Sequence, residues 1–123
     1  MDISKQFVAD WIEYSISDKP DELDDKFYTV EYLHELGFQQ DHNELWAFII
    51  HVYEQDIPDK ALAALGAGPL EELLSMAGDL YIGKVEALCR KSSKFKKLLA
   101  IVWKSSISDD VWVRVCKVRG EAW

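Results

Sequence analysis

Apolar residues recur along most of the chain at the three- and four-residue spacing that places them on one face of an α-helix. The clearest case runs from Leu45 to Tyr53, where large apolar side chains stand at relative positions 0, 3, 4, 7 and 8. Such a stripe is typical of an amphipathic helix with one buried side. The pattern therefore predicts an all-α fold.

Proline, glycine and N-cap residues divide this pattern into seven or eight short helices. The expected helices cover about 3–16, 20–36, 45–53, 60–65, 69–77, 81–89, 95–103 and 111–118. Gly37 is the expected stop of the second helix, and Asp41 or Asn43 the N-cap of the third. Ser92 or Ser93 is the expected N-cap of the helix over 95–103. Because the connections are short, we expect antiparallel helical hairpins, packed as one small bundle or as a short right-handed α-solenoid-like stack.

The strongest helix-breaking signal in the sequence is the segment Ala67-Gly68-Pro69-Leu70. Gly66 suits the left-handed position that closes a helix, and Gly68 suits an N-cap. Pro69 suits the first position of a new helix, where no amide proton is needed. We therefore expect one helix to end and another to begin within three residues, with the new helix ending at Gly78.

The segment 111–118 is rich in β-branched residues, so it fits either a helix or a strand. Ser108-Asp109-Asp110 before it is a helix start, and the sequence offers no second strand to pair with it. A lone strand would leave its backbone groups unpaired. We therefore predict a helix here.

Length and composition favour one globular domain over residues 1–123, since 49% of the residues are apolar and 29% charged. The longest run of large apolar residues, Leu45 to Ile50, is far shorter than the roughly 20 residues of a membrane span. The first residues lack the pattern of a secretory signal. Cys89 and Cys116 have no metal-binding spacing, so reduced thiols are expected. We therefore predict a cytoplasmic protein without contact to a membrane.

Charge divides the sequence into an acidic first half and a weakly basic second half. Residues 1–60 hold four basic and 15 acidic side chains, a net charge of −11, while residues 61–123 carry +3. An acidic surface repels nucleic acid and attracts a basic partner, although such charge is more often a solvated face. The acidic candidates for partner binding are Asp18, Asp21, Glu22, Asp24, Asp25, Glu31 and Glu35.

The residue types of catalytic and metal sites occur without the spacing that such sites need. His34, His42 and His51 form no HExxH motif or other ligand pair on one helix face. The serines lack the setting of a nucleophile elbow. We therefore expect no catalytic residues, no metal and no cofactor. The seven cations between Lys84 and Lys104 face net repulsion of nucleic acid by the rest of the chain, so no nucleic-acid partner is expected.

Five tryptophans are many for a chain of this length. Trp11 and Trp103 lie on the apolar stripes of their helices and are expected in the core. Trp46 falls beside its stripe, so it is a candidate partner-binding residue, with partial burial as the alternative.

The string Ala67-Gly68-Pro69-Leu70-Glu71-Glu72-Leu73-Leu74 resembles the signature A-G-P-L-E-[DE]-L-L of a bacterial protein family of unknown function. Gly78, Val85-Glu86, Val102-Trp103 and Asp109-Asp110-Val111-Trp112 extend the resemblance. It implies a small helical protein and no assigned activity.

The leading hypothesis is a non-enzymatic protein-interaction domain. A more specific version is an immunity-type inhibitor of a bacterial toxin, in which the acidic half binds a basic toxin domain. The alternatives are a small ligand- or nucleotide-handling domain that uses a helix N-terminus at Gly68, and a structural subunit of a larger assembly.

Overall fold

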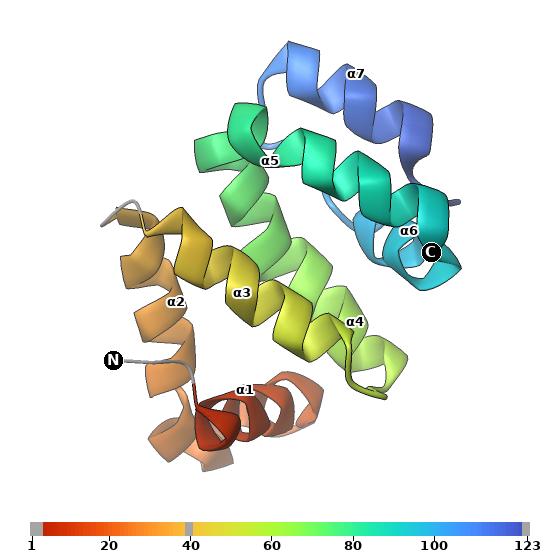
Figure 1. Ribbon diagram of the computed structural model, residues 1–123. Helices are drawn as coiled ribbons and strands as arrows, with labels where there is room; N and C mark the ends of the chain where they lie inside the picture. The colour runs from red at the N-terminus through yellow and green to blue at the C-terminus, as the bar shows by residue number, and fades with distance from the viewer. Residues whose placement is uncertain (1–3, 39–40, 122–123) are drawn as a thin grey trace. The chain divides into compact units, whose positions relative to one another are not determined.

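The computed structural model describes residues 4–38 and 41–121 (Figure 1). Within these residues every regular element is a helix, so the expected all-α class is confirmed. In chain order the elements are α1 (Lys5–Ile16), the 3₁₀-helix η1 (Pro20–Lys26), α2 (Tyr28–Phe38), α3 (His42–Tyr53), α4 (Asp59–Leu65), the π-helix η2 (Gly66–Leu70), α5 (Glu71–Lys91), α6 (Ser93–Leu99) and α7 (Asp109–Val118).

The chain forms two compact units, one up to Ala64 and one from Leu65 onward. The boundary between the two units coincides with the change from the acidic to the weakly basic half of the sequence. Unit 1 contains all four basic and 15 acidic residues of the acidic half, and unit 2 has a net charge of +3. That the whole chain is a single domain stays a prediction.

An aromatic cluster forms the centre of unit 1. Phe7 and Trp11, one helical turn apart on α1, both meet the ring of Phe48 on α3 edge-to-face, with centroids 5.8 and 5.3 Å apart. All three side chains are buried. Edge-to-face contacts add about 0.5–1.5 kcal/mol each beyond burial, so this cluster fixes α1 on α3. Trp11 is in the core, as expected.

The helix expected over 20–36 is wrong in its continuity and its end. Residues Pro20–Lys26 form a 3₁₀-helix with non-helical backbone at Leu23 (φ −115°, ψ 34°), and α2 begins only at Tyr28. Aspartates are poor helix formers because their side chains compete for backbone hydrogen bonds, which explains the interruption. Gly37 does not stop the helix but lies buried within α2. Asp41, not Asn43, is the N-cap of α3 and accepts a hydrogen bond from the Glu44 amide.

In unit 2, the long helix α5 packs against both α6 and α7 (Figure 1). The helix α7 lies close to Gly78, where an added Cβ would stand 3.1 Å from the Val111 methyl groups. Arg114 on α7 donates hydrogen bonds from Nε and Nη2 to the two carboxylate oxygens of Glu86 on α5. The pair thus ties α7 to α5 on the solvent side. The helix predicted over 111–118 is confirmed, with Ser108 as its N-cap.

The helix break expected at Gly66 to Leu70 is wrong. These residues form a π-helix that joins α4 to α5, and among the described residues no glycine has a positive φ. Gly66 is instead packed closely, since an added Cβ would lie 2.7 Å from the carbonyl oxygen of Leu98 and would overlap Ile101. The wider π turn accommodates Pro69, which lacks an amide proton. Gly68 therefore starts no helix.

The expected end of a helix near Gly78 is confirmed in part. The element α5 runs on to Lys91, but its backbone is non-helical at Ala77 (φ −139°, ψ 33°), where two helical segments meet at a kink. Ser92 is the N-cap of α6, one of the two expected positions, but α6 ends at Leu99 rather than reaching Trp103. The chain then turns away before α7, which determines the surface around Trp103.

Candidate interaction surfaces

The seven acidic candidates are all exposed on unit 1. Asp18, Asp21, Glu22, Asp24 and Asp25 follow one another along η1 and the turn before it, and Glu31 and Glu35 lie one turn apart on α2. We call these seven residues the acidic surface. Lys60 forms an ion pair with Asp18 at 2.8 Å, and its hydrogen bond holds the pKa of the Asp18 carboxyl below the ordinary value. The sequence therefore located a genuinely exposed set of carboxylates.

Trp46 is half-buried, which agrees with the alternative given for it. It lines a shallow pocket of about 260 Å³, together with Ala47, Ile50, His51 and Glu54. None of the seven acidic candidates lines this pocket. Partner binding by Trp46 stays a prediction.

Unit 1 contains a buried carboxylate that the sequence did not predict. Asp10 on α1 is only 7% exposed. Its Oδ1 accepts hydrogen bonds from Gln6 Nε2 at 2.7 Å and from Lys26 Nζ at 3.2 Å, and its Oδ2 accepts one from the Tyr28 hydroxyl at 2.5 Å. The i, i+4 spacing of Gln6 and Asp10 was the one signal of this network in the sequence.

The network shifts the pKa values of its members in the directions expected for a satisfied charge pair. The Tyr28 hydroxyl, followed by the Gln6 amide, holds the pKa of the Asp10 carboxyl below its ordinary value. The hydrogen bond to Asp10 in turn raises the pKa of both Tyr28 and Lys26. Because both carboxylate oxygens have donors, Asp10 is suited to fixing α1 against η1 and the start of α2.

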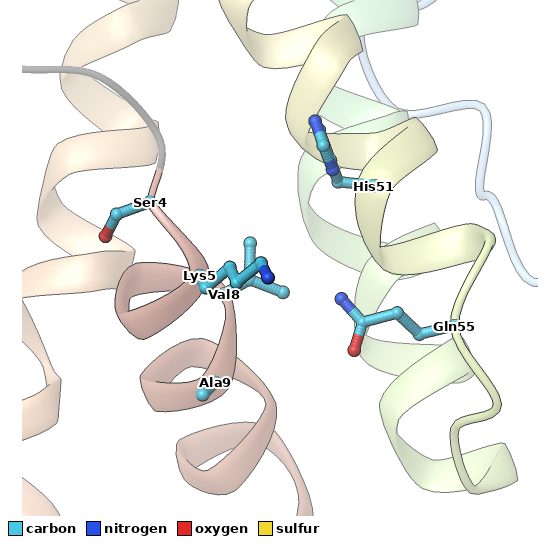
Figure 2. A pocket seen from close by; sticks show the side chains of 6 residues that line it. All are labelled: Ser4, Lys5, Val8, Ala9, His51 and Gln55. Atoms are coloured by element: carbon cyan, nitrogen blue, oxygen red, sulfur yellow. The ribbon is translucent and has the colours of Figure 1, made fainter.

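A second pocket of unit 1 lies between the start of α1 and the end of α3, with a volume of about 420 Å³. Figure 2 shows the side chains of Lys5 and Gln55 pointing toward one another across it, with Val8 beside Lys5. The hydroxyl of Ser4 points away, since it caps α1 by accepting a hydrogen bond from the Phe7 amide. This is an open, mixed polar and apolar depression.

Trp103 in unit 2 is 74% exposed, so its expected place in the core is wrong. The reason is the early end of α6 at Leu99, because only a continuing helix would have carried Trp103 onto the buried stripe. Val102 beside it is buried and anchors the segment. The indole is therefore presented outward from a fixed backbone.

Trp103 lines a pocket of about 350 Å³ on the surface of unit 2. We call it the Trp103 pocket; its lining residues are Ala100, Ile101, Val102, Trp103, Lys104, Trp112 and Arg119. The Arg119 guanidinium lies 5.3 Å from the centroid of the Trp112 ring, in cation–π contact. Lys104 forms an ion pair with Asp109 at 2.8 Å, whose hydrogen bond lowers the pKa of that carboxyl. Two indoles and two cations thus surround one hollow.

The backbone that bears Trp103 is held by one carboxylate. Glu71 at the start of α5 accepts a hydrogen bond from the Trp103 amide at 2.8 Å and another from the Ser105 hydroxyl at 3.3 Å. Ser105 has φ 40°, and it is the one non-glycine with positive φ in the described part of the chain. Such a conformation persists only where neighbouring contacts maintain it, and Glu71 supplies them.

A model described as a family of unknown function (DUF6869) matches residues 17–123. The chain belongs to this family. The membership expected from the resemblance is thereby confirmed, while the role of the signature string and the bacterial origin stay predictions. No curated protein and no solved structure matches the chain.

The DUF6869 match covers some of the surfaces described above and leaves others outside. The match includes the whole acidic surface and every residue of the Trp103 pocket. Asp10 precedes it, and so do most residues of the pocket between the start of α1 and the end of α3. Family membership thus spans both candidate interaction surfaces.

Other chemistry is sparse in the described part of this DUF6869 protein. Across residues 4–38 and 41–121, no group of three or more His, Cys, Asp or Glu side chains is placed to hold a metal ion. Neither cysteine is in a disulfide; Cys89 is buried and Cys116 exposed. No helix among these residues has both the length and the apolar character needed to cross a membrane.

Proposed function

We propose that this chain is a non-enzymatic protein-interaction domain that binds its partner through the Trp103 pocket. The supporting observation is the 74% exposure of Trp103 beside a second indole. Burying an indole removes roughly 150–250 Å² from water, which at about 25 cal/mol/Å² corresponds to roughly 4–6 kcal/mol. Most of that free energy is unused in the isolated chain and is available to a partner.

Tryptophan and arginine are the residue types that most often dominate protein interfaces, and here Trp103, Trp112 and Arg119 line one pocket. Scattered exposed apolar residues are normal on any surface. An exposed indole at the rim of a mostly apolar hollow is a different arrangement, because it offers both an anchor and a place to receive one. This combination supports binding of a protein over solvation alone.

The test uses purified products of the genes that neighbour this one in its source organism as candidate partners. With a partner that binds, W103A should weaken the affinity at least tenfold in calorimetric titrations. The control V113A truncates another exposed apolar residue, on α7, and should change the affinity less than twofold. An unchanged affinity of W103A for every partner found would contradict the proposal.

The more specific proposal is an immunity-type inhibitor whose acidic surface attracts a basic toxin domain. It is supported by seven exposed carboxylates and by the net charge of −11 in unit 1. Opposite charges accelerate encounter more than they strengthen the final complex. If the proposal holds, co-expression of the chain should relieve growth inhibition by a basic toxin domain encoded by a neighbouring gene. Because the charges act on encounter, D24K should slow association with that domain severalfold at low salt.

The matched control is D56K, which makes the same charge change at an exposed residue between α3 and α4. Equal association rates for D24K and D56K would contradict the proposal that the acidic surface attracts the partner. The ligand-handling alternative has lost its geometric basis, because no helix begins at Gly68.

A further inference from the structure

We infer that the Trp103 pocket binds an acidic segment of a partner protein, with an apolar side chain of that segment in the hollow and a neighbouring carboxylate on Arg119. This inference rests on the proposed function and adds the chemistry of the partner. It concerns unit 2 only, whereas the toxin proposal concerns the acidic surface of unit 1.

The hollow has the size and lining of a site for apolar side chains. Its volume of about 350 Å³ is at the lower end of the roughly 300–1,000 Å³ typical of ligand pockets. Ile101 and the two indoles supply an apolar floor and rim. A pocket of this size and character suits one or two apolar side chains better than an extended polar ligand.

The rim of the hollow bears positive charge. Arg119 lies against the face of Trp112, and a guanidinium held by stacking keeps its N–H edge for a planar carboxylate. Lys104 contributes less, because Asp109 already neutralises it in part. The pocket thus has one positioned cation that matches a carboxylate close to an apolar anchor.

The surroundings of the Trp103 pocket are also positively charged on balance. The Gly120 amide donates a hydrogen bond to the Lys96 carbonyl, so the segment that bears Arg119 lies next to α6 with its lysines. Glu121 is the opposing charge in this segment. Unit 2 as a whole has ten basic and seven acidic residues. A protein segment with a few carboxylates is attracted by this local net charge of +3.

The experiment uses three fluorescein-labelled 12-residue peptides and the full chain at low salt. One peptide has a central Leu-Phe pair flanked by Asp and Glu, the second has the same centre flanked by Lys, and the third has acidic flanks around Ser-Ser. Fluorescence polarisation should show at least tenfold tighter binding of the first peptide than of the other two. Equal binding of the acidic Leu-Phe and Ser-Ser peptides would overturn the role of the pocket.

Two matched variant pairs locate the binding. R119Q and W103A should each weaken binding of the acidic Leu-Phe peptide at least fivefold. K84Q removes an exposed cation that lies over Tyr81, and V113A an exposed apolar group, so both should stay within twofold of the parent chain. Equal losses with R119Q and K84Q would mean that general charge attraction explains the binding, which would overturn the inference.

Nuclear magnetic resonance provides an independent readout. The indole N–H signals of Trp103 and Trp112, assigned from Trp→Phe variants, should shift on addition of the acidic Leu-Phe peptide, and that of buried Trp11 should not. Tighter binding of a single-stranded oligonucleotide than of this peptide would overturn the inference. So would a dimer of the chain itself that R119Q abolishes, since a second copy would then be the occupant.

The two proposals fail in distinguishable ways. If W103A weakens a natural partner but none of the peptides binds in the pocket, the acidic chemistry is wrong and the protein-interaction function stands. If the acidic peptide binds as expected while W103A leaves every natural partner unaffected, the pocket has this chemistry but the proposed function is wrong.

Discussion

Gly66 packs so closely on Ile101 that an added Cβ atom would overlap the Ile101 Cγ2 methyl group. It would also lie 2.7 Å from the backbone carbonyl oxygen of Leu98, which has little freedom to move. The position requires glycine because of space and not because of backbone conformation. This contact joins the π-helix to the end of α6 within unit 2.

We therefore expect G66A to lower the free energy of unfolding by about 1–3 kcal/mol, the usual effect of overpacking. Gly83, within α5, has open space around an added Cβ. There alanine restricts the unfolded chain without strain, so G83A should raise stability by roughly 0.5–1 kcal/mol. Urea denaturation measures both, and a G66A chain as stable as the parent would show that the close contact relaxes freely.

Removal of the exposed indole should leave the fold intact. Because Trp103 is 74% exposed, W103A should change the free energy of unfolding by no more than about 0.5 kcal/mol. Trp11 is buried against Phe48, so W11A should lose roughly 3–5 kcal/mol. Denaturant titrations followed by circular dichroism compare the two, and a large loss in W103A would mean that the indole serves the core.

The Asp10 network predicts a pH dependence of stability. The pKa of Asp10 is lowered in the folded chain, so its stabilising effect is complete above the unfolded value of about 3.9. It is lost as the pH falls through the lower, folded value. The parent chain should therefore lose stability on acidification below about pH 4 more steeply than D10N, although D10N is the less stable at pH 7.

D24N serves as the control for this comparison, since it makes the same charge change at an exposed residue of η1. It should keep the steepness of the parent chain. Y28F removes the largest cause of the shift, so the pKa of Asp10 should move up toward its ordinary value in a carboxyl-carbon titration. An unchanged pKa of Asp10 in Y28F would show that the hydroxyl is not its main partner.

The two cysteines should differ in reactivity. Burial raises the pKa of the Cys89 thiol to about 11, so very little reactive thiolate exists at pH 8. Cys116 is exposed on α7. A thiol reagent such as dithiobis-nitrobenzoate should modify one thiol in the native chain and two after denaturation, and C116S should abolish the rapid reaction. Rapid modification of two thiols in the native chain would contradict this burial.

The sequence was sufficient for the fold class and for most helices, because apolar spacing is a local property of the chain. It was insufficient at Gly66, where both helix termination and close packing favour glycine, and only the position of Ile101 distinguishes them. The prediction that Gly37 ends a helix was wrong for a related reason, because Gly37 is buried within α2.

The candidate surfaces show a similar division. Exposed carboxylates could be recognised from composition, because charged residues rarely lie in a core without partners. Trp103 could not, since its exposure depends on where α6 ends, and helix ends are poorly determined by periodicity. A usable signal did exist for its neighbours. Trp112 on α7 and Arg119, the C-cap of α7, are seven residues apart, a spacing of about two helical turns that brings them to the same side.

The two hydrogen bonds of Glu71 give the Trp103 surface a thermodynamic property of its own. They fix the loop from Trp103 to Ser105 before any contact with another molecule. A loop that is already ordered loses little conformational entropy on association, so more of the free energy of burying the indole appears as affinity. By the same reasoning, E71Q would lower the affinity for a partner by making the loop that bears Trp103 less ordered, although it alters none of the side chains that line the Trp103 pocket.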